Sequence, residues 1–340
     1  MSRSRARFSA ALLLGCGALL LMVAWSLTLG RFGVAAGDVF RALWAALTGT
    51  DSGLAANAEA VVLHVRAPRV LAALAVGAAL AGAGAAYQAL FRNPLVSPDI
   101  LGVTSGCSLG AAVALLLGWS AIGLQAMAFG GGLAAVAMVV ALAAALRGRD
   151  ALLTLILTGV VVGSLFAAGI AMAKTVADPQ QQLPAITFWL LGSFAGVAPA
   201  DLAGAIAPLA LGAAPLVLLR WRLDALALSD DEARSLGVEV RRLRLAIILG
   251  ATLMTAAAVA LAGAIGWVGL VVPHAARLMA GPGFARVLPL SLLLGAAFML
   301  AVDTLCRTAL ATEIPPGIVT AIVGTPVFIL LLAFAARRTP

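Results

Sequence analysis

The sequence predicts an all-α, polytopic membrane protein with about ten transmembrane helices. Of its 340 residues, 63% are hydrophobic and only 11% are charged, and the mean hydropathy of +1.10 lies far above that of soluble domains. The apolar runs are continuous, whereas strands of a membrane barrel alternate over about ten residues. Because each crossing takes roughly 20 apolar residues, no soluble domain of any size fits, and residues 1–340 are predicted to form one transmembrane domain.

The first predicted span, residues 8–29, follows Arg3, Arg5 and Arg7. This charge pattern resembles a signal peptide, but the apolar run exceeds the roughly 7 to 15 residues of a signal core, so we expect a retained helix. The eighth span is short and contains Pro273. The other predicted spans cover residues 67–90, 98–118, 121–146, 151–176, 201–219, 242–262, 265–280, 287–305 and 317–336.

An even number of spans places both termini on one side of the membrane, and the terminal arginines mark that side as cytoplasmic. On this topology 16 of the 22 basic residues face the cytoplasm. The other six face outward: Arg31, Arg41, Arg66, Arg69, Lys174 and Arg307.

Small residues recur at the spacing that lets membrane helices approach closely. Gly102, Gly106 and Gly110 form two overlapping GxxxG steps, and Gly159 with Gly163 forms another. Residues 183–196 are too short to cross comfortably, so we expect a helix that lies at the interface or re-enters the membrane.

The sequence contains no set of residues for catalysis. Its one lysine, Lys174, follows no GxxxxGK[ST] loop, so ATP is not hydrolysed by that route. Two distant histidines, His64 and His274, provide neither a catalytic set nor a metal site, and no cofactor is expected in this chain. The basic residues are scattered between spans without interleaved aromatics, which excludes nucleic acid as a partner; the bilayer is the expected surrounding.

A secondary carrier driven by ions would place ionisable residues in the middle of its spans. Here Asp303 is the best exception, followed by Lys174 near a span end, and both fit a paired or helix-end residue better than a relay. An ion-driven carrier is therefore a weaker alternative, and a purely structural scaffold is a third.

Residues 220–244 form the only long charged island. Ser229 and Glu232 have the spacing of a capping box, and Gly237 is placed to end the same short helix. With Leu226, Leu228 and Leu236 available to dock, such a helix suits a partner's cleft; the alternative is an ordinary solvated connector.

Three of the outward-facing arginines lie at the ends of predicted spans, and positive charge there runs against the orientation bias. Arg66 and Arg69 flank Pro68, and Arg307 lies at the end of the ninth span. They either receive an acidic soluble protein or anchor the helices by snorkelling.

Four segments together resemble a known family. They are RAPRVLAALAVGAALAGAGAAYQALFRNPLVSPDILGVTSG from Arg66, DEARSLGV from Asp231, ALAGAIGWVGLVVPHAARL from Ala260, and EIPPGIVTAIVGTPVFILLL from Glu313. In order and spacing they are similar to the membrane subunits of type II ATP-binding-cassette (ABC) importers, which take up ferric siderophores, haem and cobalamin.

The resemblance implies a homodimeric permease in the bacterial inner membrane, with two ATPase subunits that hold ATP and Mg²⁺ and one periplasmic substrate-binding protein. The implied cargo is an iron chelate (ferric siderophore or haem), with cobalamin or molybdate as alternatives.

The resemblance also implies site residues. Arg66, Arg69 and Arg307 match the docking arginines for the binding protein, and Asn93, Pro94 and Leu95 match a cytoplasmic gate element. Small polar gate residues of some relatives are replaced here by Leu152 and Leu153, so that part does not carry over. Within residues 220–241, the implied ATPase-coupling residues are Leu228, Ser229, Asp230, Asp231, Glu232, Arg234, Leu236 and Gly237.

Overall fold

The computed structural model describes residues 2–30, 32–146 and 151–336, and all regular structure in these ranges is helical. Within them, seven stretches are long and apolar enough to cross a membrane. Three shorter apolar helices and the 21-residue helix α15 (Pro316–Ala336) complete the bundle, so the predicted all-α polytopic fold is confirmed. The seven are α1 (Ser2–Thr28), α3 (Ala56–Ala60) with η1 (Val61–Arg66) and α4 (Ala67–Leu90), α6 (Ala121–Leu146), α7 (Ala151–Val176), α9 (Pro199–Leu218), α12 (Val240–Ala262) and α14 (Phe284–Thr308).

The shorter helices correct several predicted boundaries. The span expected at residues 98–118 begins with a 3₁₀ turn, η2 (Pro98–Leu101), and turns at Gly102, whose φ is 73°. Only α5 (Val103–Leu116) continues, and its 14 residues reach about 21 Å. The eighth span shortens to α13 (Val268–Ala280), whereas the second begins eleven residues early, at Ala56. The last of the short helices is α8 (Gln182–Leu191), which overlaps the segment expected at the interface. The last predicted span, residues 317–336, is formed by α15.

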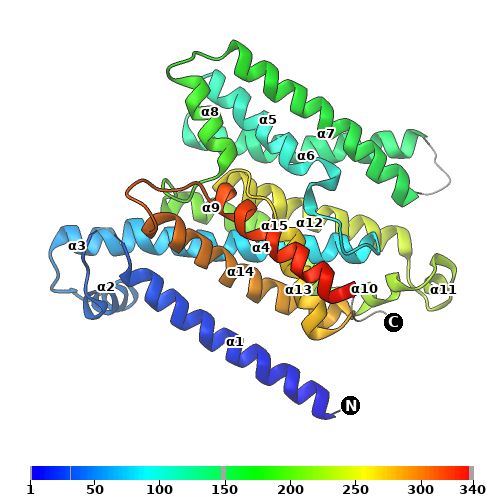
Figure 1. Ribbon diagram of the computed structural model, residues 1–340, viewed down its shortest axis with the longest axis horizontal. Coiled ribbons are helices and arrows are strands. Elements are labelled where there is room, and N and C mark those ends of the chain that lie inside the picture. The colour runs from blue at the N-terminus through cyan, green and yellow to red at the C-terminus, as the bar shows by residue number, and fades with distance from the viewer. Residues whose placement is uncertain (1, 31, 147–150, 337–340) are drawn as a thin grey trace.

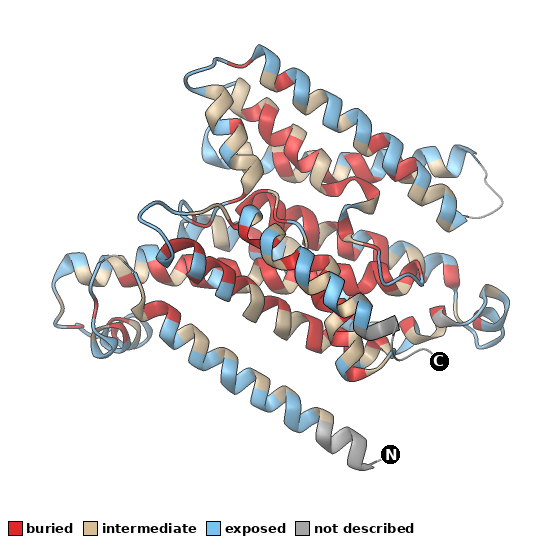
Figure 2. Ribbon diagram, in the orientation of Figure 1, coloured by how far each residue is buried: buried red, intermediate tan, exposed pale blue. Residues whose placement is uncertain are grey.

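The core of the bundle is α4 with α12, α13 and α14, and α5 to α8 form a second group above it in Figure 1, which packs on the core through α12. In α4 and α12, 78% of the membrane-crossing window is buried, against 11% in α1 and 17% in α7 and α9. The outward faces of α1 and α7 are accordingly exposed in Figure 2. These weakly buried helices meet lipid or a partner, whereas α4 is enclosed by protein.

Small residues allow the core helices to touch backbone to backbone. A Cβ at Gly84 of α4 would lie 1.9 Å from the carbonyl oxygen of Gly269 in α13. The predicted glycine pattern acts in the same way, because a Cβ at Gly106 or Gly110 of α5 would lie within 2.3 Å of a carbonyl oxygen of α6. The close approach predicted for these helices is confirmed.

The two ends of the bundle differ. α1 begins and α15 ends at the side that carries α10 (Arg220–Leu223) and α11 (Asp230–Ser235), while α2 (Ala36–Thr48) and α3 lie at the other (Figure 1). This arrangement agrees with an even number of crossings. Arg31, Arg147, Arg149, Arg337 and Arg338, which entered the charge count, lie outside the described residues.

Candidate functional site

The charged island folds into α10, the 3₁₀ turn η3 (Asp224–Ala227) and the six-residue helix α11. The predicted capping box is present at the start of α11. The N–H of Glu232 donates to Ser229 Oγ at 3.3 Å, and the N–H of Ser229 donates to Glu232 Oε2 at 2.9 Å. These bonds satisfy backbone donors that a helix start otherwise leaves open.

The pKa of Glu232 is lowered, first by the bond from the N–H of Ser229 and then by a bond of 2.8 Å that the Ser229 hydroxyl donates to the same carboxylate. Because the depressed pKa favours the charged carboxylate, the contribution of this cap is present above the ordinary glutamate pKa. It is lost as the pH falls through the folded value.

The end of α11 is a Schellman motif at the predicted glycine. Gly237 has φ 77°, its N–H donates to the carbonyl of Arg234 at 2.9 Å, and the N–H of Val238 donates to that of Ala233 at 3.1 Å. Both ends of this short helix are therefore set by its own sequence. The leucines that flank α11 differ in exposure. Leu228 and Leu236 are exposed, whereas Leu226 is 2% exposed and packs inward, which corrects its assignment as a docking residue.

The remaining predicted coupling residues lie on the exposed part of the island. Asp231 forms an ion pair with Arg234 at 2.7 Å on the surface of α11. Asp230 instead contacts the bundle, because its carboxylate lies 2.7 Å from Arg244 in α12 and 3.6 Å from Arg92.

Arg92 joins the island to the end of α4. Its Nε donates to the carbonyl oxygen of Leu226 at 2.6 Å, and its guanidinium also donates to that of Leu228. The residue adopts φ 50°, a conformation rare for a side chain of this size. Sequence reasoning did not assign Arg92 a role; the available signal was its position directly before Asn93 and Pro94.

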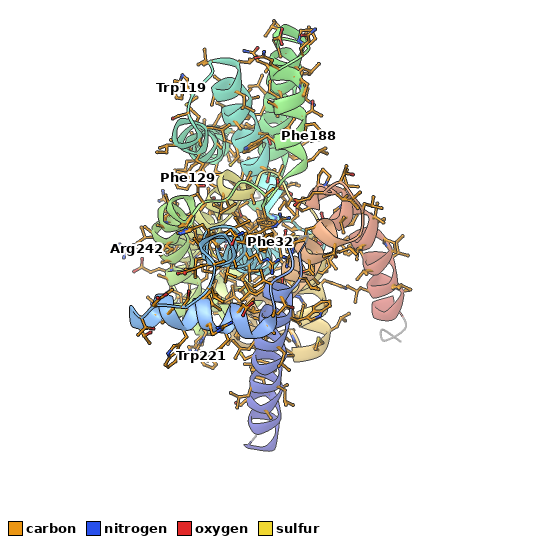
Figure 3. The ribbon with its side chains drawn as sticks, turned by 90° about the vertical axis from the view of Figure 1, so that its left-hand side faces the viewer. Phe32, Trp119, Phe129, Phe188, Trp221 and Arg242 are labelled. Carbon is orange, nitrogen blue, oxygen red and sulfur yellow. The ribbon has the colours of Figure 1, made fainter. Side chains whose placement is uncertain are left out.

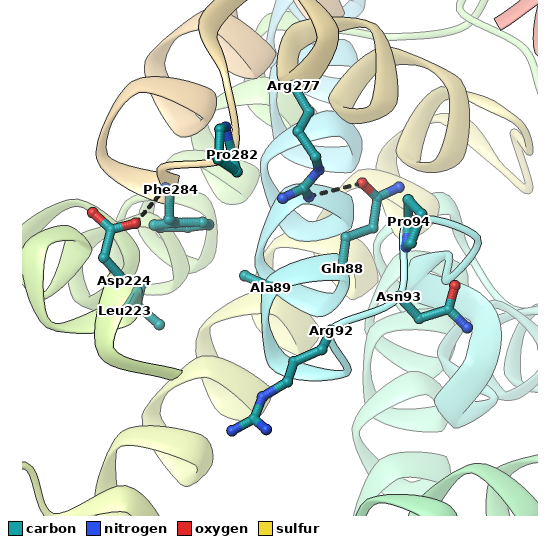
Figure 4. Close-up of a pocket in the computed structure, with 10 residues that line it drawn as sticks. All are labelled: Gln88, Ala89, Arg92, Asn93, Pro94, Leu223, Asp224, Arg277, Pro282 and Phe284. Atoms are coloured by element: carbon teal, nitrogen blue, oxygen red, sulfur yellow. Dashed lines mark hydrogen bonds between the residues drawn. The ribbon is translucent and has the colours of Figure 1, made fainter. Parts of the chain in front are cut away.

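Asn93, Pro94 and Leu95 follow as an exposed loop. Asn93 Oδ1 accepts from the N–H of Leu95 at 2.9 Å, which is an Asx turn and shapes the chain after α4. The loop borders a cavity of about 290 Å³, where Arg277 donates to Gln88 Oε1 at 3.2 Å (Figure 4). This places the predicted gate element beside a cavity with both polar and apolar walls at the α11 end of the molecule.

The three outer arginines are brought together, but not on the surface. Arg66, Arg69 and Arg307 are 4%, 8% and 7% exposed. Arg69 contacts Asp303 at 2.9 Å and Glu313 at 3.0 Å, while Arg307 donates to the carbonyls of Ser26 and Leu29. Arg66 donates to the carbonyls of Leu27, Thr28 and Phe32.

In this chain these guanidinium groups therefore hold α1, α4, α14 and the connections between them. Asp303, completely buried, is the carboxylate at the centre of the network, and Glu313 is its part-exposed member. The pairing of Asp303 agrees with the expectation that it is not a relay. These contacts do not test whether the arginines dock the binding protein, so docking stays a prediction.

Among the described residues, no group of three or more His, Cys, Asp or Glu side chains is placed to hold a metal ion.

Known proteins of similar sequence are permease proteins of import systems. The chain is 39% identical to the molybdate import system permease protein MolB of Haemophilus influenzae, over 89% of each chain. It is 41% identical to a probable iron chelatin transport system permease protein of Helicobacter pylori, over 80% of this chain and 82% of that one.

A solved structure shares the fold. It is an inward-facing conformation of a transporter assigned to the metal-chelate ABC type, with a TM-score of 0.85, 36% identity, and 96% of this chain and 99% of that chain covered.

These findings define the class: the protein is the permease subunit of an ABC importer, a multi-pass component of the cytoplasmic membrane without a catalytic site of its own. Such a subunit works with an ATPase, which binds the ATP, and with a binding protein. The chain belongs to the FecCD transport family, whose model matches residues 18–334.

Proposed function

We propose that this permease moves an iron chelate, a ferric siderophore or haem, from the periplasm to the cytoplasm. It does so as a homodimer with two ATPase subunits below and one periplasmic binding protein above. The observation that carries the coupling part of this proposal is the position of α11, an exposed, doubly capped helix that Arg92 ties to the end of α4.

In this scheme the residues 220–241 are the coupling region, and Leu228 and Leu236 enter a cleft of the ATPase. The caps keep α11 rigid, so that a displacement by the ATPase is transmitted rather than absorbed by unfolding of the helix. Arg92 then passes the displacement to α4, and the adjoining loop of Asn93, Pro94 and Leu95 moves as the gate. The chain thus contributes a path and a lever, while the chemistry occurs in the ATPase.

Coupling is tested with variants at two places. Glu232→Arg or Gly237→Pro removes one cap of α11, and we expect lower ATPase association and at least tenfold lower uptake, about 1.4 kcal/mol of coupling. Arg92→Gln leaves the surface of α11 intact, so assembly should persist while transport per ATP hydrolysed falls. The measurements are co-purification of the ATPase, its stimulated activity and uptake in proteoliposomes.

Asp38→Arg is the matched control, because it makes the same charge change as Glu232→Arg in α2, at the opposite end of the bundle, and breaks only an exposed pair with Arg41. Wild-type assembly and uptake in both cap variants would refute the coupling assignment.

Docking of the binding protein is proposed at Arg66, Arg69 and Arg307. The support is local: Arg69 retains 10% of its side chain exposed, and its partner Glu313 is 39% exposed. An acidic side chain of the binding protein can compete with Glu313 for Arg69. Charge reversal at the buried Arg66 or Arg307 would disturb folding, so docking is better assayed with variants of Glu313. The affinity of these variants for the binding protein should depend on salt.

The cargo assignment rests on the family and on the iron-chelatin relative, and molybdate is the second candidate because of the Haemophilus relative. We expect proteoliposomes that contain the permease, its ATPase and the binding protein to accumulate radiolabelled ferric siderophore or haem when ATP is inside. Molybdate and cobalamin should not be accumulated under the same conditions. Accumulation of molybdate alone would transfer the assignment to that oxyanion, and uptake that followed an ion gradient without ATP would support a secondary carrier.

A further inference from the structure

A groove runs between α1, α10 and the start of α14, at the end of the bundle that carries α11. Its outer part has a volume of about 680 Å³ and its deeper part about 420 Å³. The two parts share Phe8, Leu12 and Arg286, so they form one continuous groove.

The deeper part is apolar and ends where α1 meets α14. A Cβ at Gly15 would lie 2.6 Å from Leu293 Cδ2, so the helices are in contact at that level. From Phe8 to Gly15 the helix rises about 10 Å, which is less than half of a hydrocarbon core of roughly 30 Å. Because α1 is only 11% buried and lies along the outside of the bundle (Figure 1), the groove opens toward lipid.

The outer part is positively charged. Arg220 and Arg286 line it, and neither guanidinium group has an ion-pair or hydrogen-bond partner within the described part of the chain. The acidic residue beside them, Asp224, accepts the N–H of Phe284 at 2.5 Å and so caps α14. Two arginines and one aspartate leave this part with a net charge of +1.

The charges lie at the level of the membrane interface. Phe8 begins the span of α1, Arg220 follows the end of α9, and Arg286 lies in the first turn of α14. Trp221, 66% exposed and 5.4 Å from the Arg220 guanidinium, lies at the periphery in Figure 3. Tryptophan is typical of this level in membrane proteins.

We propose that this groove binds an anionic glycerophospholipid. The phosphate lies between Arg220 and Arg286, and one acyl chain follows Leu12 and Leu294 into the apolar part. Guanidinium groups bind phosphate oxygens through paired hydrogen bonds, and basic pockets between membrane helices on the cytoplasmic side are suited to anionic headgroups. A zwitterionic lipid offers the same phosphate, but its cationic headgroup is repelled by the net positive charge of the site.

The test uses purified, delipidated protein and two lipids with the same acyl chains, phosphatidylglycerol and phosphatidylcholine. We expect phosphatidylglycerol to bind more tightly, measured by native mass spectrometry and by the rise in thermal midpoint. Arg220→Gln and Arg286→Gln should each weaken its binding about fivefold, and the double variant about thirtyfold. Ala11→Trp fills the apolar part without changing a charge and should weaken both lipids.

Arg242→Gln is the matched control, because Arg242 lies near the same end of the bundle but pairs with Glu239 on the surface at 2.9 Å. Size-exclusion profiles identify any variant that fails to fold. If the double variant fails, the single variants and Ala11→Trp still test the site. Equal binding of both lipids, or an equal loss in Arg242→Gln, would overturn the site. So would variants that retain the lipid but lose the ATPase, which would make Arg220 and Arg286 protein contacts.

Discussion

Replacing Asp303 by Asn is expected to lower the free energy of unfolding by about 3–5 kcal/mol. The Asp303 side chain is 0% exposed, and it lies 2.9 Å from Arg69 and 3.7 Å from Arg307. Asparagine keeps the size of the side chain but removes its charge, so the buried Arg307 loses its carboxylate and Arg69 keeps only the part-exposed Glu313. The loss is measured as a lower thermal midpoint and a lower denaturant midpoint in detergent.

Glu313→Gln is the matched control for this variant. Its side chain is 39% exposed, and Arg69 keeps Asp303 when it is changed. Solvent screening limits the expected loss to about 1 kcal/mol or less. Adding Arg69→Met to Asp303→Asn should cost less than the sum of the two single variants, because the buried positive charge that faced Asp303 is removed with it. Equal midpoints for Asp303→Asn and Glu313→Gln would contradict a structural role of the network.

The second large effect is expected at the contact between α4 and α13. Gly84→Ala places a methyl group where the carbonyl oxygen of Gly269 lies only 1.9 Å away. Backbone atoms on both helices must move apart, because neither can change rotamer, and we expect a destabilisation of about 1–3 kcal/mol. Uptake should fall as well, since α13 and α4 both border the cavity beside the predicted gate.

Gly130→Ala in α6 is the comparison, because a Cβ there meets no atom within 4 Å. Alanine favours helix over glycine by up to about 1 kcal/mol, so this variant should be neutral or slightly stabilised. If the same substitution destabilises the protein at Gly84 but not at Gly130, the loss comes from the helix contact and not from helix propensity. A stabilised Gly84→Ala would show that α4 and α13 separate easily.

Local features of this protein were predictable in detail. The capping box at Ser229 and Glu232 and the turn at Gly237 form as expected because all their partners lie within a few residues. Most membrane spans were also predictable, because an apolar run must be helical in lipid. The exceptions occur where Gly102 and Trp267 adopt positive φ and break an apolar run that composition alone reads as continuous.

The partners of the buried charges were not predictable. Arg69 pairs with residues 234 and 244 positions away, and Arg92 reaches the carbonyl of a residue 134 positions away. The outer helix α2 was also missed, although Val39, Ala42 and Ala45 have the spacing of a buried helical face. In each case the sequence carried the residue type but not the neighbour that determines its role.

The amino-acid sequence by itself determined that this chain is a helical membrane protein with a capped helix in its charged island. It did so because hydrophobic length and helix capping are local properties of the chain. Only the tertiary structure decided that Arg69 and Arg307 turn inward to Asp303 and that Arg92 joins α11 to α4. It also decided that the Arg220 and Arg286 guanidinium groups have no ion-pair or hydrogen-bond partner among the described residues. Those outcomes depend on which charges the packed helices bring within hydrogen-bond distance, and that distance is set by the whole bundle.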